Sequence, residues 1–127
     1  MNYTFDWSVV ANGAPYVTIS SISISFNDVS ANRLGKPESI MIGFDEDNLV
    51  LGIKPYAGET GIKPYLFASR QRNGWVRIGC KDFIQYLGSL LNCNFNTARK
   101  YVAKYDKESG YLIVDLKQAQ DDTKSEE

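Results

Sequence analysis

The pentapeptide Gly-Ile-Lys-Pro-Tyr occurs twice in close succession, at residues 52–56 and again at residues 61–65. The first copy ends an alternating apolar run and the second begins another. A repeat at such a junction indicates that the chain is built from two related segments, which we place at residues 15–56 and 64–117. We therefore predict an internal duplication in which both segments contribute the same succession of elements. The alternative is an ordinary α+β domain whose hairpins resemble each other as hairpins in general do.

Before the repeat, the sequence predicts strands and one short helix. Residues 2–10 carry β-prone side chains at every second position and predict an N-terminal strand. Residues 16–26 are rich in β-branched residues and serine, but their apolar phase reverses midway, so they form either two strands or one strand with a bulge. Asn27 or Asp28 can cap a short helix, which Gly35 can close.

The second segment repeats this order. Residues 64–68 match the start of the first segment and predict a strand. The dipeptide at residues 73–74 is Asn-Gly, a strong signal for a tight hairpin. A helix begins at about Lys81, has its apolar residues on one face, runs past Gly88 and ends near Asn92. A glycine inside a helix costs about 1 kcal/mol relative to alanine.

Each segment ends in a predicted hairpin around an acidic turn. Residues 39–44 and 48–54 form the first hairpin, and residues 101–105 and 111–116 form the second. The predicted fold class is therefore α+β and β-rich. Two tandem β-β-α-β-β units form one pseudo-symmetric domain of antiparallel hairpins with two helices.

Length and composition fit one packed domain. The chain has 127 residues, of which 43% are hydrophobic, and we place the domain at residues 1–118 and a disordered acidic tail at residues 119–127. No run approaches the roughly 20 apolar residues of a membrane span, and the N-terminus lacks the layout of a signal peptide. We expect a cytoplasmic protein that does not associate with membranes.

The residue inventory argues against most catalytic chemistry. The chain contains no histidine, which excludes Ser-His-Asp and Cys-His machinery. Its two cysteines, Cys80 and Cys93, are too few for a disulfide framework or a zinc site, and we expect both to be structural thiols. The acidic residues 45–47 lack the glycine-containing pattern of a calcium loop. We expect no enzymatic activity, no metal and no cofactor.

A net charge of −1 conceals an uneven charge distribution. Residues 63–107 carry nine basic and two acidic side chains, whereas residues 1–62 carry three basic and seven acidic ones. Arginines on a hairpin tip can pair with phosphates while a neighbouring aromatic ring stacks on bases. The same tip can instead be a merely solvated turn with Trp75 in the core. The predicted nucleic-acid-binding residues are Arg70, Arg72, Trp75, Arg77, Lys81, Arg99, Lys100 and Lys104.

Two strands, a short helix, Leu-Gly and a further hairpin follow one another in both segments, with Leu34-Gly35 in the first and Leu87-Gly88 in the second. This order resembles the AbrB/MazE-like swapped-hairpin DNA-binding family. The resemblance implies that each segment corresponds to one copy of the family's unit. Two interleaved units would then form a small DNA-binding barrel within a single chain. Where the family carries Gly-Arg before its second strand, this chain has Ile22-Ser23.

Two functional hypotheses follow. The first is a small nucleic-acid-associated protein, a DNA-binding regulator of transcription, that uses the basic segment at residues 63–107, with DNA favoured over RNA. The alternative is a protein-interaction module of phage or mobile-element type, an inhibitor or adaptor that binds a host protein. A homodimer is compatible with both.

Overall fold

A computed structural model describes the backbone of residues 14–120 and the side chains of residues 14–117. The predicted strand at residues 2–10 lies outside the described residues. The strands are β1 (Tyr16–Ile19), β2 (Ser23–Phe26), β3 (Ser39–Asp45), β4 (Val50–Pro55), β5 (Tyr65–Leu66), β6 (Gln71–Arg72), β7 (Trp75–Gly79), β8 (Arg99–Asp106) and β9 (Tyr111–Gln120). The helices are α2 (Asp28–Arg33) and α3 (Lys81–Leu91), and η1 (Ala68–Arg70) is a short 3-10 turn.

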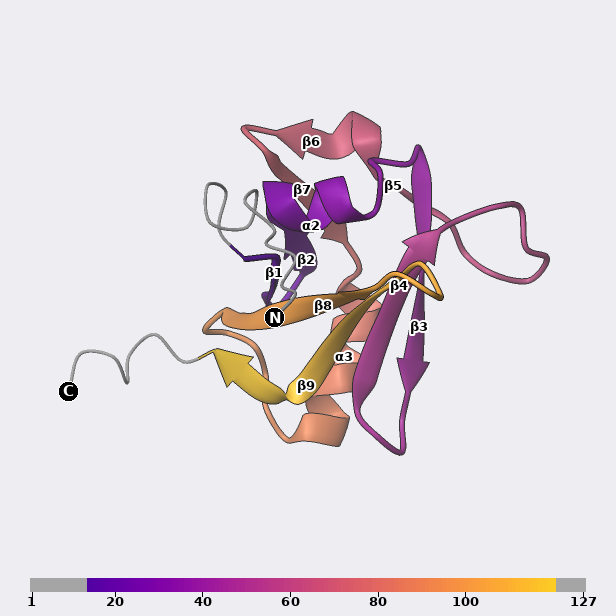
Figure 1. The fold of residues 1–127 in the computed structure, drawn as a ribbon. Coiled ribbons are helices and arrows are strands. Elements are labelled where there is room, and N and C mark those ends of the chain that lie inside the picture. The colour runs from indigo at the N-terminus through magenta and orange to yellow at the C-terminus, as the bar shows by residue number, and fades with distance from the viewer. Residues whose placement is uncertain (1–13, 121–127) are drawn as a thin grey trace, which may run out of the picture.

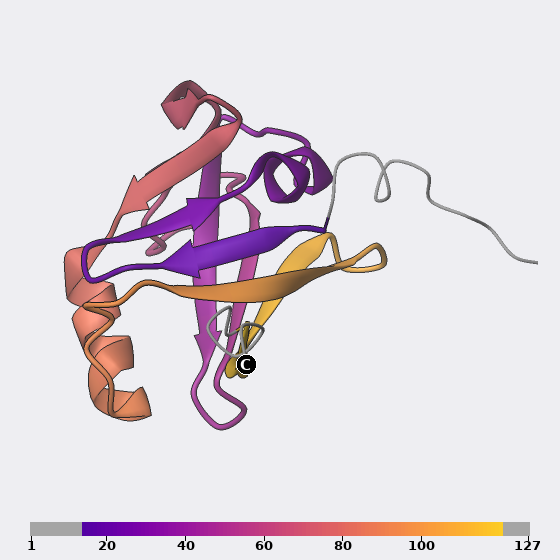
Figure 2. The ribbon, with the colours of Figure 1, turned by 90° about the vertical axis from the view of Figure 1, so that its left-hand side faces the viewer.

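All nine strands belong to one antiparallel sheet, in the order β5-β3-β4-β9-β8-β1-β2-β7-β6. The sheet curls, so that β3 and β4 run across the direction of β1, β2 and β7 (Figures 1 and 2). The hydrophobic core fills the inside of the curl and includes Phe26, Phe67, Ile84 and Tyr101. The prediction of a β-rich α+β fold with antiparallel hairpins and two helices is confirmed for the described part of the chain.

The phase reversal within residues 16–26 marks a hairpin of two strands. Val17 pairs with Phe26 and Ile19 with Ile24, and all four side chains are buried. Asn27 then caps α2, because its side-chain oxygen accepts a hydrogen bond of 3.0 Å from the backbone N–H of Ser30. The capping prediction and the two-strand alternative are both correct.

Residues 64–68 form less strand than their sequence predicts. Only Tyr65 and Leu66 pair with β3. The chain then forms the turn η1, and the next two residues pair with β7 as strand β6. Phe67 accounts for the turn, because its side chain is fully buried and packs edge-to-face on Phe26, with ring centroids 5.3 Å apart. The two outermost strands of the sheet are thus separated along the chain only by a short turn.

The predicted Asn-Gly hairpin and the predicted helix both form. Asn73 and Gly74 have positive φ, as a tight hairpin turn requires, and connect β6 to β7. α3 ends at Leu91, followed by the left-handed Asn92. A Cβ atom built on Gly88 would lie 2.4 Å from the carbonyl oxygen of Cys93. Glycine is needed there because the chain after the helix folds back against it.

The C-terminal strand is longer than predicted. β9 runs to Gln120 and pairs with β8 near both of its ends, with a register shift between Tyr101 and Ala103. It therefore extends two residues into the segment for which the sequence predicts a disordered tail at 119–127. Residues 121–127 lie outside the described residues.

Two junctions in the sheet, β2–β7 and β4–β9, each have an outward-facing central pair with a buried apolar pair on either side. Across β2–β7, Ile24 pairs with Ile78 and Phe26 with Val76, around the central pair of Ser25 and Arg77. Across β4–β9, Leu51 pairs with Val114 and Ile53 with Leu112, around the central pair of Gly52 and Ile113. All eight flanking side chains point into the core.

Candidate nucleic-acid interface

A continuous row of outward-facing side chains crosses four strands of the sheet. Lys100 on β8 pairs with Thr18 on β1, Thr18 pairs with Ser25 on β2, and Ser25 pairs with Arg77 on β7. The neighbours of Thr18, Ser25 and Arg77 on both sides are buried in the core, and so is Tyr101 beside Lys100, so strand alternation directs these four outward. Figure 2 shows β7, β2, β1 and β8 side by side. We call the outer surface of these four strands and β6 the basic face.

Both cations of this row are positioned by neighbouring side chains. The ammonium of Lys100 lies 4.4 Å from the ring centroid of Tyr16, a cation–π contact. The guanidinium Nε of Arg77 donates a hydrogen bond of 3.1 Å to the hydroxyl oxygen of Ser23. The Ser23 contact uses one of the five N–H donors of the Arg77 guanidinium.

The β6–β7 hairpin extends the basic face beyond Arg77. Arg72 pairs directly with Trp75, and Trp75 lies on the same side of β7 as Arg77. The side chain of Trp75 is 43% exposed, so the alternative that places this tryptophan in the core is wrong. Arg72 donates hydrogen bonds of 3.3 and 2.9 Å to the backbone oxygens of Ser69 and Gln71, which hold it against the hairpin.

Lys104 completes the basic residues of this face. It shares the outward alternation of β8 with Lys100, lies opposite Ile113 and is exposed. The same alternation brings Asp106 outward at the far end of β8. That carboxylate accepts a hydrogen bond of 2.8 Å from the hydroxyl of Ser109 and so belongs to the adjoining turn.

The remaining predicted residues lie elsewhere. Arg70 and Lys81 lie where β5 approaches β7, and with Lys63 they line two adjoining hollows of about 360 and 200 Å³. Both hollows are also bounded by Gly79, at the end of β7. Arg99 pairs with the buried Ile19, so it does not share the outward side of Lys100, and its guanidinium lies 5.9 Å from the ring centroid of Phe95. The structure therefore gathers five of the eight predicted residues on one face.

Neither the cysteines nor the acidic turn forms a reactive centre. Burial raises the pKa of the Cys80 thiol to about 11, so that it is protonated at neutral pH. Hydrogen bonds from the side chain and backbone of Asn48 lower the pKa of Asp45, whose carboxylate caps its own turn. Within residues 14–120, no group of three or more Cys, Asp or Glu side chains is placed to hold a metal ion. In the same range no helix has the length and apolarity needed to cross a membrane.

Sequence reasoning missed the hydroxyl residues of the row and the cation–π partner Tyr16. Tyr16 and Thr18 occupy alternate positions in β1, as Ser23 and Ser25 do in β2. This spacing is visible in the sequence, but the strand register is needed to see which side chains lie next to one another. Comparison of the chain with protein-family models, curated proteins and solved structures gave no match. A function for this chain is therefore inferred from its own residues and their geometry.

Proposed function

We propose that the protein is a small non-enzymatic nucleic-acid-binding protein whose basic face contacts the phosphate backbone of DNA. The observation that carries this proposal is the row Lys100–Thr18–Ser25–Arg77, in which two cations flank two hydroxyl side chains on adjacent strands. Cations neutralise phosphates and release their counterions, and hydroxyl groups donate hydrogen bonds to phosphate oxygens.

The spacing of the row suits a duplex. Neighbouring strands lie about 4.8 Å apart, so three steps separate the backbones of Lys100 and Arg77 by at most about 14 Å. The major groove of DNA is about 12 Å wide. The two cations can therefore contact phosphates on both sides of one groove. Trp75 and Arg72 extend the contact along β6 and β7.

The choice of DNA is linked to a second proposal, an internal duplication of the barrel. We propose that β1-β2-α2-β3-β4 and β6-β7-α3-β8-β9 are two copies of one unit, arranged as in the AbrB/MazE-like swapped-hairpin family. The strand order supports this arrangement, because β2 pairs with its proposed equivalent β7 and β4 pairs with its proposed equivalent β9, as an exchange of the two units requires.

The proposal is tested by titrating fluorescently labelled duplex DNA with the protein at about 50 mM and about 200 mM salt. Affinity should fall steeply between the two concentrations. The double variant Arg77→Ala/Lys100→Ala should bind more weakly than the wild type and depend less on salt. Lys54→Ala is the matched control, because Lys54 is a half-exposed strand lysine outside the basic face. Absence of binding at both concentrations, or equal losses for the double variant and the control, would contradict the proposal.

A protein-interaction module is the second candidate, and one observation favours it. Gly43 and Gly52 are paired across β3–β4, and the absence of side chains there leaves a groove of about 220 Å³. Met41, Lys54 and Tyr111 line the groove, and the Lys54 ammonium lies 5.5 Å from the Tyr111 ring centroid. Co-purification from a native extract distinguishes the candidates. A stoichiometric protein without nucleic-acid absorbance would favour the second, and nucleic acid alone would favour the first.

A further inference from the structure

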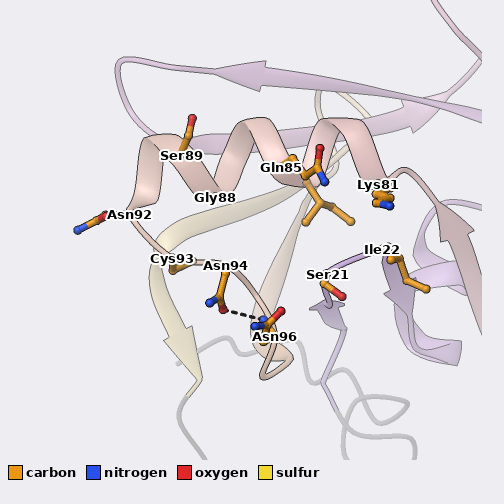
Figure 3. A pocket seen from close by; sticks show the side chains of 11 residues that line it. Ser21, Ile22, Lys81, Gln85, Gly88, Ser89, Asn92, Cys93, Asn94 and Asn96 are labelled. Atoms are coloured by element: carbon orange, nitrogen blue, oxygen red, sulfur yellow. Dashed lines mark hydrogen bonds between the residues drawn. The ribbon is translucent and has the colours of Figure 1, made fainter.

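A cleft of about 730 Å³ runs beside α3 at one end of the basic face (Figure 3). One wall is the side of α3 from Lys81 to Ser89, and the opposite wall consists of the β1–β2 turn and the chain after the helix. The backbone N–H of Cys80 donates a hydrogen bond of 3.0 Å to the carbonyl of Ile22, which joins the turn to the start of α3. The volume lies in the range of small-molecule and cofactor sites.

The shape of the cleft is fixed by the chain itself. Gly88 lets the following segment approach the helix, where the N–H of Cys93 donates a hydrogen bond of 2.9 Å to the carbonyl of Gly88. Phe95 is buried and anchors the segment in the core. Asn94 accepts a hydrogen bond of 2.9 Å from the backbone N–H of Asn96, which leaves its amide NH₂ group directed away from that contact (Figure 3). The cleft is therefore present before any ligand binds.

The lining offers neutral hydrogen-bonding groups, one cation and an apolar platform. Gln85 and Asn94 are exposed, and their amides can both donate and accept, as the edges of nucleobases do. Lys81 adds a positive charge near one end of the cleft. Ile22 is 48% exposed and presents an apolar surface on which a flat ring can pack. The lining includes no carboxylate, so nothing in it repels a phosphate.

Position links the cleft to the basic face. β1 ends and β2 begins at the turn that forms one wall, and β7 leads directly into α3, which forms the other. Figure 2 shows this turn beside the start of the helix. A duplex whose phosphates contact Lys100 and Arg77 can thus place a neighbouring unpaired nucleotide at Lys81 and the cleft.

We infer that this cleft binds an unpaired nucleotide, with its phosphate at Lys81, its base on Ile22 and the base edge hydrogen-bonded by Gln85 and Asn94. This inference rests on the proposed nucleic-acid binding and deepens it. The preferred ligand is then a duplex that lies next to an unpaired stretch. A helix with every base paired can occupy the basic face but cannot fill the cleft, because its bases are stacked inside the duplex.

The first experiment compares three labelled probes of matched length: a fully paired duplex, the same duplex with an internal loop of unpaired adenines, and a single strand. The looped duplex should bind tighter than the paired duplex by about fivefold or more, the value of one good contact between an amide side chain and adenine. Gln85→Ala and Ile22→Ser should each reduce that ratio while leaving the paired duplex unaffected. Asn32→Ala, which removes an exposed amide from α2, is the matched control.

Cys93 supplies a second readout that does not depend on affinity. It lines the cleft and is half-buried, whereas Cys80 is buried and stays protonated at neutral pH. Alkylation of the wild-type protein, followed by intact mass, should therefore modify Cys93 first. A saturating looped duplex should slow that modification, and a saturating paired duplex should not.

The outcomes distinguish failure of the proposed nucleic-acid binding from failure of the cleft inference alone. If no probe binds at low salt, the proposed function fails together with this inference. If the paired duplex binds with salt dependence but the loop adds no affinity and no protection of Cys93, only the cleft inference is overturned. Protection of Cys93 by a short peptide and not by the looped duplex would also overturn it, in favour of a peptide ligand.

Discussion

The sheet contains two junctions of the same geometry and different outer chemistry. At β2–β7 the outward central pair is Ser25 and Arg77, and at β4–β9 it is Gly52 and Ile113. Inside, both junctions present aliphatic side chains to one core, and β2–β7 adds the ring of Phe26. Inward side chains pack in the core and stabilise the fold, whereas outward side chains can differ without any change of register. The outer surface can therefore be charged at β2–β7 and form a groove over Gly52 at β4–β9.

The largest effect is expected where the two junctions are alike, in the core. Phe26→Ala at β2–β7 removes a buried ring that packs on Phe67 and should lower the free energy of unfolding by about 3–5 kcal/mol. Leu51→Ala at β4–β9 should cost about 2–5 kcal/mol. Urea denaturation followed by circular dichroism measures both. A loss below about 1 kcal/mol at either site would show that its junction is not part of the common core.

The next effect concerns the glycine that lets the chain close against α3. Gly88→Ala should lower the free energy of unfolding by about 1–3 kcal/mol, because the new methyl group meets the carbonyl oxygen of Cys93. Since the chain beyond the helix must move away, the alkylation rate of Cys93 should rise. Gly52→Ala serves as the control, since a Cβ at Gly52 has no atom within 4 Å. Equal stability of Gly88→Ala and wild type would rule out the close approach.

A third prediction sharpens the contrast between the outer surfaces. Arg77→Ala should reduce DNA affinity severalfold and lower the slope of log affinity against log salt by about one. Lys54→Ala, beside the groove on the other junction, should change neither. Stability should be nearly unaffected in both variants, because both side chains lie on the outer surface. The measurement is a salt series of anisotropy titrations on one DNA duplex.

The smallest expected change is a gain in stability. Gly52→Ala should raise the free energy of unfolding by about 0.5–1 kcal/mol, because alanine loses less backbone entropy than glycine in a strand. The same substitution at Gly74 should have the opposite sign, because Gly74 has a φ of +86° in the hairpin turn. Thermal unfolding of the two variants side by side gives both signs. A loss of stability for Gly52→Ala would indicate that the groove is filled in the folded protein.

Much of the fold could be predicted, because it depends on interactions between residues that are close together in the sequence. The Asn27 cap, the Asn73-Gly74 turn and the apolar stripe of α3 each depend on neighbours within a few residues. The shortness of β5 could not be predicted, because it follows from the burial of Phe67 against Phe26, far away in sequence. The same holds for Gly88, which looks like a weak point of a helix until the returning chain is placed beside it.

The candidate interface, too, could be predicted from the sequence only in part. The excess of basic residues between positions 63 and 107, with the neighbouring Trp75, predicted a set of eight residues, of which the structure places five on one face. Strand alternation and pairing then determined which residues share a surface, and they separated Arg99 from Lys100 although the two are adjacent in sequence. The uncharged contributors, Thr18 and Ser25, carry no compositional signal and emerge only from the register.

The short turn η1 has a consequence for how the protein responds to proteolysis. Both margins of the sheet, β5 and β6, are joined by four residues, the buried Phe67 and the exposed η1 residues Ala68–Arg70. One tryptic cut after Arg70 would release both margins at once and leave β3 and β7 with unpaired backbone groups. Exposed strand edges of that kind template the addition of further chains. A single nick at this turn should therefore convert a monodisperse protein into one that self-associates, which light scattering would detect.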